Sequence, residues 1–316
     1  MKAGMSAWSL EFFSAEDLQA LFRLVGVSAA VVQFEPGPLK GVFGVSICET
    51  ATVIKISTSS GLVVVSDRNK EFLCFSGDRL GRAGFATVHG QSLRRGVLAG
   101  MKLDLSESFF QLHSGCEARI LVAPRSLLLE KLVDMNAHHL LDGMMTCNQM
   151  HLNVDLYALL MRYLEGFDDP AFELVAVDPV DLLVDIIMSP QGIGFSAARF
   201  LSRHQLVKSM IKFSSNHPTA QIDLDQLAEV LFCSRRSLIQ GSKELMGIGP
   251  GELLRLVRLE RVHQVLRNRA KQAQLGKHAV APIAAHFGFS SRCHFAAAYQ
   301  RQYGNSPSET LRASKA

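Results

Sequence analysis

The sequence has few of the features that mark secreted, membrane-spanning or metal-binding proteins. Six cysteines are spread over 316 residues without a C-x-x-C pair, which argues against a disulfide framework or a zinc site and predicts reduced thiols. No apolar run approaches the roughly 20 residues that a membrane-spanning helix needs. Glu11, Glu16 and Asp17 near the N-terminus are unlike a secretory signal. These absences predict a soluble, cytoplasmic protein.

The usual chemical motifs of enzymes are also missing. His138, His139 and His151 have no acidic or thiol partners at ligand spacing, and no His-x-His pair is followed by a suitable Glu. The pair Gly41 and Gly44 lies between expected strands and not before a helix, so it does not predict a phosphate-binding loop. We therefore expect no catalytic residues, no metal and no cofactor, and a protein that is not an enzyme.

Positive charge is concentrated in one part of the chain. The whole sequence has 33 basic and 29 acidic residues, a formal net charge of +4. Residues 1–203 have 17 basic and 22 acidic residues, whereas residues 204–316 have 16 basic and 7 acidic ones. The net charges of −5 and +9 predict a polyanionic partner for the C-terminal part only.

Residues 1–125 are predicted to form a β-rich, sensor-like region with an opening helix. Ser14 is suited to cap a helix from Ser14 to Val25, in which apolar residues recur every three or four positions. Short β-branched and aromatic runs then alternate with turn residues, at 30–34, 52–56, 61–65, 71–75 and 118–122. This spacing predicts a small antiparallel sheet, a sandwich or a barrel-like region, and hence an α+β protein once the later helices are included.

Residues 126–203 are predicted to be helical, as a dimerisation region or a linker. One apolar stripe at helical spacing ends at Gly166, and another ends before Pro190. No Lys or Arg occurs between Tyr163 and Ala198, where seven carboxylates accumulate. We expect a solvated acidic face there, with a protein-contact patch as the alternative.

The basic part, residues 204–316, contains a repeat with an offset of 57 residues. Between residues 228 and 255, nine residues are identical to those 57 positions later, where chance gives roughly two. The identical pairs are Ala228/Ala285, Phe232/Phe289, Ser234/Ser291, Arg235/Arg292, Gly247/Gly304, Pro250/Pro307, Glu252/Glu309, Leu254/Leu311 and Arg255/Arg312. This pattern indicates a duplicated supersecondary unit.

Each copy is predicted to consist of two short helices joined by a tight turn. In the first copy, Ser234 is a natural N-cap for a second helix that ends near Gly247. In the second copy, Ser290 or Ser291 caps the corresponding helix, and Gly304 ends it. A generic pair of helices would fit the apolar spacing almost equally well. The two helix–turn–helix units are expected at about residues 222–247 and 281–304.

The charge favours DNA binding over a generic helix pair. The second helix of each copy begins with Ser-Arg and continues with side chains that can donate to guanine or adenine in the major groove. One helix from Pro250 to Arg267, roughly 25 Å long, would separate the two units. The candidate DNA-binding residues are Ser234, Arg235, Arg236, Gln240, Lys243, Ser291, Arg292, His294, Gln300 and Arg301. Added phosphate-binding capacity is expected from Arg255, Arg258, Arg261, Arg267 and Arg269.

The sequence from Pro282 to Phe295, continued from Tyr303 to Pro307, resembles the characteristic motif of AraC/XylS-type transcription regulators. The first helix–turn–helix resembles the same family, although Ser242 stands where the family usually has Phe. Another departure is that Gln240 and Ala297 stand where the family often has Arg. The β-then-helix N-terminal part is more loosely similar to ethanolamine-operon regulators.

The resemblance implies a DNA-binding domain over residues 204–316 that acts on double-stranded promoter DNA. It also implies an activator with RNA polymerase as a partner, and it leaves a small-molecule effector and a homodimer open. Two other functions remain as alternatives: a nucleic-acid-binding protein without sequence choice, and an enzyme in the β region with an accessory DNA-binding domain.

Overall fold

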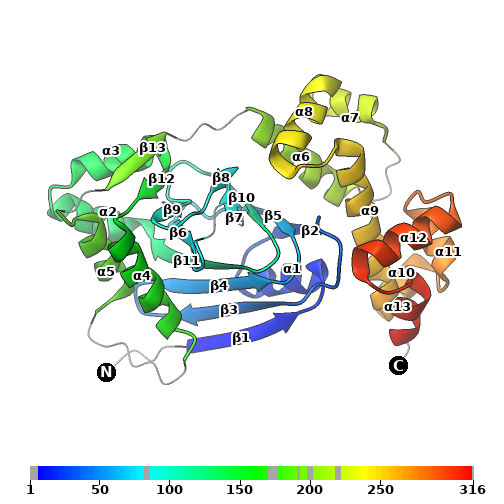
Figure 1. Cartoon of the computed structure of the whole chain (residues 1–316), viewed down its shortest axis with the longest axis horizontal. Coiled ribbons are helices and arrows are strands. Elements are labelled where there is room, and N and C mark those ends of the chain that lie inside the picture. Colours follow the sequence, from blue (N-terminus) through cyan, green and yellow to red (C-terminus); the bar gives the residue numbers. More distant parts are fainter. Residues whose placement is uncertain are drawn as a thin grey trace. The chain divides into compact units, whose positions relative to one another are not determined.

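The computed structural model describes residues 6–81, 86–169, 177–190, 193–197, 202–217 and 222–314, and its chain divides into two compact units (Figure 1). The first unit comprises Met1–Phe12, Lys40–Ser59 and Ser66–Arg199, and the second comprises Phe13–Leu39, Ser60–Val65 and Phe200–Ala316. Strand β5 (Leu62–Asp67) spans one of the boundaries. The three sequence-based regions, 1–125, 126–203 and 204–316, stay a prediction.

The first unit is built around an eight-stranded sheet. Its strand order is β1-β3-β4-β11-β6-β9-β12-β13. The strands are β1 (Ser6–Phe12), β3 (Gly41–Ile47), β4 (Thr52–Thr58), β11 (Cys116–Pro124), β6 (Phe72–Asp78), β9 (Val97–Ala99), β12 (Cys147–His151) and β13 (Gly194–Ala197). A second set of paired strands in this unit consists of β10 (Glu107–Leu112), β7 (Ala86–Val88) and β8 (Gln91–Ser92).

The eight-stranded sheet is open within the described residues, because β1 and β13 form its two edges. The predicted α+β class is confirmed, and the β region is made of antiparallel sheets and not of a closed barrel. Each of the five runs predicted as strands overlaps a strand over most of its length, namely β2 (Ala29–Gln33), β4, β5, β6 and β11.

Among the described residues, four helices belong to the first unit: α2 (Arg125–Asp134), α3 (His138–Thr146), α4 (Val154–Gly166) and α5 (Pro179–Ile187). Asn153 caps α4 and Asp178 caps α5, each accepting backbone N–H groups of the first helical turn. Leu160 and Leu183 pack from these helices into one apolar core with Phe75 of the sheet. Burial of this kind of side chain stabilises the fold by about 1.5–3 kcal/mol each.

Two expectations for residues 126–203 were wrong in part. The region is not continuously helical, because β12 and β13 pair with each other within it. The acidic stretch is also more than a solvated face. Its carboxylates form ion pairs with basic side chains: Glu165 with Arg79, Asp168 with Arg119 and Lys55, and Asp181 with Lys131.

The second unit is mainly helical. It contains α1 (Ala15–Leu24), β2, α6 (Ser202–Asn216), α7 (Leu224–Val230), α8 (Arg235–Met246), α9 (Pro250–Arg267), α10 (Arg269–Leu275), α11 (Val280–His286), α12 (Arg292–Tyr303) and α13 (Pro307–Ala313). The predicted opening helix is confirmed as α1, and its N-cap is Ser14. The predicted connecting helix is confirmed as α9, with the predicted bounds.

Helix α1 and strand β2 contact the C-terminal helices inside the second unit. The Asp17 carboxylate lies 3.3 Å from the Arg267 guanidinium, and Glu16 pairs with Lys271. The Gln302 side-chain amide donates to the main-chain carbonyl of Gln33 at 3.0 Å. Residues 13–39 therefore belong structurally with the helices that follow residue 200 and not with the large sheet.

Replacing Phe232 with Asn is expected to stabilise the second unit by about 0.5–1 kcal/mol. Phe232 has a left-handed backbone (φ +50°), and its side chain is 98% exposed, so the change relieves strain without loss of packing. The repeat mate is the control: the Phe289 ring lies 5.0 Å from that of Phe295, so Phe289→Asn should destabilise. Urea unfolding followed by circular dichroism measures both. A loss of stability in Phe232→Asn would contradict the strain argument.

Candidate nucleic-acid interface

The first helix–turn–helix consists of α7 and α8. Asp223 and Gln226 form a reciprocal capping box at the start of α7, and Leu227 and Ala228 bury its inner face. The Ser234 hydroxyl accepts the backbone N–H of Ser237 at 3.1 Å and so begins α8. Helix α8 ends in a left-handed glycine, Gly247 (φ +68°), at the predicted position.

The second helix–turn–helix consists of α11 and α12. Ile283 of α11 and Tyr299 of α12 are fully buried, and Phe295 is nearly so. Ser291, one of the two predicted caps, accepts the backbone N–H of His294, and Gly304 (φ +80°) ends the helix. The bounds of α8 and α12 thus follow the same capping chemistry in both copies, as their sequences predict.

All ten candidate DNA-binding residues have exposed side chains. On α8, Arg236, Gln240 and Lys243 are spaced by four and three residues, which places them on one helix face. Arg235 lies beside that face, where its guanidinium contacts the Asp225 carboxylate at 3.0 Å. Ser234 and Ser291 act as helix caps, so their hydroxyls are engaged with backbone in this structure.

The corresponding face of α12 has much less charge. With the 57-residue offset, Cys293, Ala297 and Gln300 occupy the positions of Arg236, Gln240 and Lys243. Cys293, Ala296 and Ala297 are all exposed there. The sequence-based list omitted these three, although the repeat register pairs Cys293 with Arg236 and Ala297 with Gln240. Arg292, His294, Gln300 and Arg301 remain as the polar and basic side chains exposed on α12.

Arg236 and Lys243 have no ion-pair partner among the residues that the structure describes. Gln240 donates to the Glu244 carboxylate at 3.0 Å. Gln240 must therefore break a hydrogen bond before it can contact a ligand, whereas Arg236 and Lys243 have no ion pair to break. An exposed cation without a partner loses only its hydration.

Several arginines of α9 are engaged inside the unit. Arg255 pairs with Glu252, Arg261 donates to the carbonyl of Ser215 and to Gln264, and Arg267 pairs with Asp17. Burial lowers the pKa of Arg258 and of Arg261. Arg269 is exposed at the start of α10. Of the five arginines expected to add phosphate-binding capacity, Arg269 is the one whose side chain is exposed, and the expectation stays a prediction.

A buried polar cluster connects α9 to α12. Tyr303 donates to the Glu260 carboxyl at 3.3 Å, and the His263 ring stacks on the Tyr303 ring with centroids 4.0 Å apart. His263 also lies 2.6 Å from the Tyr299 hydroxyl, which donates to Thr310. Burial raises the pKa of Glu260 to about 7 and lowers the pKa of His263 to about 3. Both side chains are therefore largely neutral in the folded chain between about pH 3 and pH 7.

Comparison with known proteins identifies this helical arrangement. A family model described as a helix-turn-helix domain matches residues 227–313. Over 138 residues the chain is 25% identical to the XylDLEGF operon transcriptional activator 2 of Pseudomonas putida, covering 44% of this chain and 85% of that protein. The C-terminal domain is of the AraC type. The protein is a DNA-binding transcription regulator whose C-terminal domain resembles those of AraC-type regulators, as its sequence motifs predict.

Solved structures of AraC-type proteins are also similar to parts of the chain. A transcriptional regulator from Chromobacterium violaceum with an AraC-type DNA-binding domain is 23% identical, covers 35% of this chain and 92% of its own, and has a TM-score of 0.31. The AraC-like transcriptional activator CuxR is 13% identical, covers 80% of this chain and 94% of its own, and has a TM-score of 0.39.

The described residues contain neither a metal-binding cluster nor a membrane-spanning helix. No group of three or more His, Cys, Asp or Glu residues is arranged to hold a metal ion in the part of the chain that the structure describes. Among the same residues, no helix combines the length and apolar character needed to cross a membrane.

Proposed function

We propose that this regulator reads a specific DNA sequence with α8 and α12 in successive major grooves. The observation that carries the proposal is the exposed face of Arg236, Gln240 and Lys243, which begins at a serine-capped helix N-terminus and is duplicated in position on α12. A helix N-terminus also favours a nearby phosphate. Helix α9, of 18 residues, is about 27 Å long and suits the spacing of about 34 Å between successive grooves.

The two helices are proposed to read DNA by different chemistry. On α8, Arg236 can donate bidentately to guanine, Gln240 can pair with adenine once it leaves Glu244, and Lys243 can contact phosphate. On α12, the small exposed side chains of Ala296 and Ala297 would contact thymine methyl groups, while the exposed Arg292 and Arg301 would contact phosphate. Ser234, Arg235, Ser291, His294 and Gln300 complete the proposed interface.

The partners are proposed by analogy with the relative. Because that protein is a transcriptional activator, we propose that this one activates transcription through contact with RNA polymerase in the cytoplasm. A small-molecule effector, bound by the first unit, would modulate it, and a homodimer would present two sets of recognition helices. The main-chain crossings at residues 12–13 and 39–40 join the first unit to α1 and β2, which contact α9 and α12 within the second unit. This continuity supports a route for the effector signal.

Selection from a random DNA pool, followed by footprinting on the enriched sequences, tests the proposal. We expect two protected major-groove segments about one helical turn apart. Equal recovery of all sequences would instead support the alternative without sequence choice. We also propose that the protein has no catalytic activity. Turnover of a substrate by the full chain would instead support the alternative of an enzyme in the β region.

Alkylation of Cys293 with N-ethylmaleimide is expected to weaken specific DNA binding at least about 10-fold, because the adduct would obstruct α12 in the groove. Cys293 is the one cysteine of the six that is classed as exposed, so it should react first. Bound DNA should protect it, and mass spectrometry locates the adduct. Cys293→Ser is the control, and its DNA binding should resist the reagent. If Cys293 is alkylated at the same rate with and without DNA, α12 does not form part of the DNA interface.

A further inference from the structure

One pocket in the first unit has the features of an anion site. It has a volume of about 270 Å³ and is lined by β1, β3, β4, β11 and the residues that follow α4. Two cations, Lys55 and Arg119, lie on its wall together with Asp168. Since each of these residues comes from a different part of the sequence, the sheet register must bring them together.

The register places the pocket residues in one row across the sheet. Ser9 of β1 is opposite Gly44 of β3, Gly44 is opposite Lys55 of β4, and Lys55 is opposite Arg119 of β11. Directly opposed residues point to the same face of a sheet. Gly44 has no side chain, so the row has a gap between Ser9 and Lys55. Val53, two residues before Lys55, adds an apolar wall on the same face.

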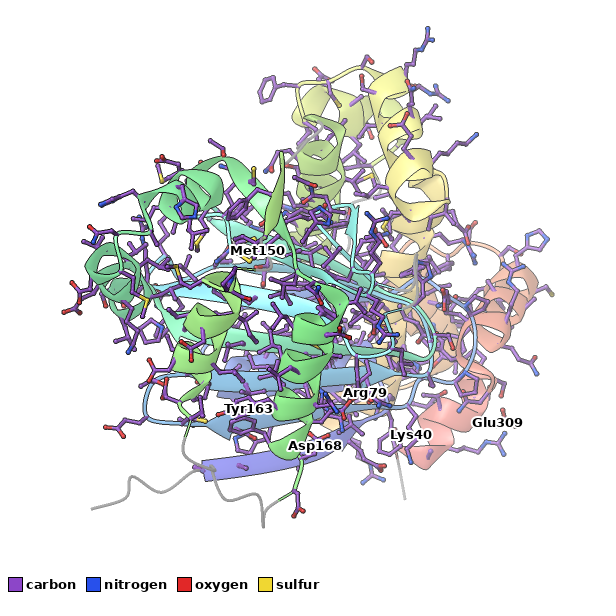
Figure 2. All side chains as sticks on the ribbon, turned by 60° about the vertical axis from the view of Figure 1, so that its left-hand side comes forward. Lys40, Arg79, Met150, Tyr163, Asp168 and Glu309 are labelled. Atoms are coloured by element: carbon purple, nitrogen blue, oxygen red, sulfur yellow. The ribbon has the colours of Figure 1, made fainter. Side chains whose placement is uncertain are left out.

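Helix α4 covers the continuation of this row and ends at the pocket. The row continues to Gly77 of β6, where an added Cβ would lie 2.9 Å from both Met161 and Tyr157 of α4. The Leu164 carbonyl accepts a hydrogen bond from Arg119 at 3.2 Å. Beyond the end of α4, Phe167 and Asp168 close the pocket, and Figure 2 shows Asp168 beside the end of that helix.

The pocket already holds a carboxylate on its cations. Asp168 accepts two hydrogen bonds from the Arg119 guanidinium, at 2.8 and 2.6 Å, and one from Lys55 at 2.8 Å. Although burial alone raises it, the hydrogen bonds from Arg119 and Lys55 keep the pKa of Asp168 below its ordinary value. Asp168 is 39% exposed and Lys55 is 24% exposed, so solvent and small solutes can reach the pair.

Arg119 has a hydrogen-bond donor that is not satisfied by the described residues. Its side chain is 2% exposed, and its Nε has no hydrogen-bond partner among the described residues. A buried donor without a partner is costly, and such a group is expected to serve a ligand or a change of partner. The second carboxylate near Arg119, Glu117, is 17% exposed and is also held by Arg79 at 3.1 Å, so Asp168 is the more easily displaced of the two.

We propose that this pocket binds a small organic carboxylate, whose carboxylate replaces Asp168 on Arg119 and Lys55 and whose apolar body lies against Val53 and Phe167. Exchange of one carboxylate for another keeps the charges of the cluster balanced, while Asp168 moves into solvent and the residues after Phe167 lose their ion pairs with the sheet. The inference rests on the proposed function in one respect, because it supplies the chemical class and the site of the effector proposed there.

Calorimetric titration of the full chain with cyclohexanecarboxylate and with cyclohexanecarboxamide tests the site. The two probes have nearly the same shape and differ in charge. We expect saturable binding of the carboxylate and roughly 10- to 100-fold weaker binding of the amide, since hydrogen bonds to charged groups are at stake. Equal binding of both probes, or no binding of the carboxylate, would overturn the proposal.

Three variants make the test specific to the row of residues. Lys55→Met should weaken carboxylate binding roughly 10- to 100-fold, whereas Asp168→Asn, which removes the internal competitor, should tighten it about 10-fold. Arg79→Met is the matched control, since Arg79 belongs to the same ion-pair network but does not line the pocket. An unchanged affinity in Lys55→Met, or a loss in Arg79→Met as large as that in Lys55→Met, would assign the binding elsewhere.

The same protein samples are then tested for sequence-selective DNA binding. Carboxylate binding without DNA selection would refute the proposed function and leave this site standing. DNA selection without carboxylate binding would refute the site alone. If both are present, the carboxylate should change the affinity for the selected DNA in the wild-type chain and at lower concentrations in Asp168→Asn.

Discussion

Arg236→Ala is expected to weaken binding to the selected DNA site by roughly 10- to 100-fold at constant salt, because a bidentate contact with a base contributes about 1–3 kcal/mol. Arg236 lies at the second position of α8, is exposed, and has no ion-pair partner among the described residues. Its guanidinium can therefore form new hydrogen bonds without first breaking any within the protein. Electrophoretic mobility shifts with specific and scrambled DNA measure the change.

The neighbouring guanidinium provides the matched control. Arg235 carries the same charge one residue earlier, but it contacts Asp225, and both side chains are more than half exposed. Because such a surface pair contributes about 1 kcal/mol or less to stability, Arg235→Ala should fold normally. It should also weaken DNA binding less than Arg236→Ala does. An equal loss in the two variants would mean that charge alone, and not position on the helix, determines the contact.

The salt dependence separates base contacts from phosphate contacts on α8. If Arg236 reads a base, its removal should lower the ratio of specific to non-specific affinity and leave the salt dependence nearly unchanged. If Lys243 contacts phosphate, Lys243→Ala should weaken binding to all sequences and reduce the salt slope by about one. If Arg236→Ala leaves the ratio of specific to non-specific affinity unchanged, Arg236 does not contact a base.

The C-terminal helices were predictable because local chemistry fixes their ends. Ser234 and Ser291 cap α8 and α12, and Gly247 and Gly304 provide the left-handed residues that end them. Pro250 begins α9 at the first helical turn, where its missing N–H has no cost. Residues close together in the sequence supply all of these interactions, so the ends of these helices can be predicted from the sequence alone.

Strand β12 was not predictable in the same way. Cys147–His151 contains no β-branched or aromatic run, and it is a strand because β9 and β13 pair with it. The pocket around Arg119 has the same origin. Lys55, Arg119 and Asp168 are far apart in the sequence, and their proximity depends on strand register and on where α4 ends. Sequence patterning therefore located the DNA-binding helices but not the candidate effector site.

Glu260→Gln is expected to change how the stability of the second unit depends on pH. The Glu260 carboxyl has an ordinary pKa of 4.5 and a pKa of about 7 when folded, chiefly because it is buried. Its contribution to stability is full below pH 4.5 and is lost as the pH rises through about 7. Gln keeps the shape and cannot ionise, so the variant should gain stability relative to wild type by about 1.4 kcal/mol per pH unit across that window. The total difference is about 3 kcal/mol.

Hydrogen exchange of the α9 backbone amides, compared between variant and wild type at each pH, measures this difference within the second unit. His263 provides an opposing control, because burial lowers its pKa from 6.5 to about 3. The stability that depends on a neutral His263 is full above pH 6.5 and is lost as the pH falls toward 3. Between pH 4.5 and 6.5 the two slopes oppose each other in the wild type, so their removal one at a time should give opposite trends. Parallel trends in Glu260→Gln and His263→Gln would show that other groups control the pH response of the buried cluster.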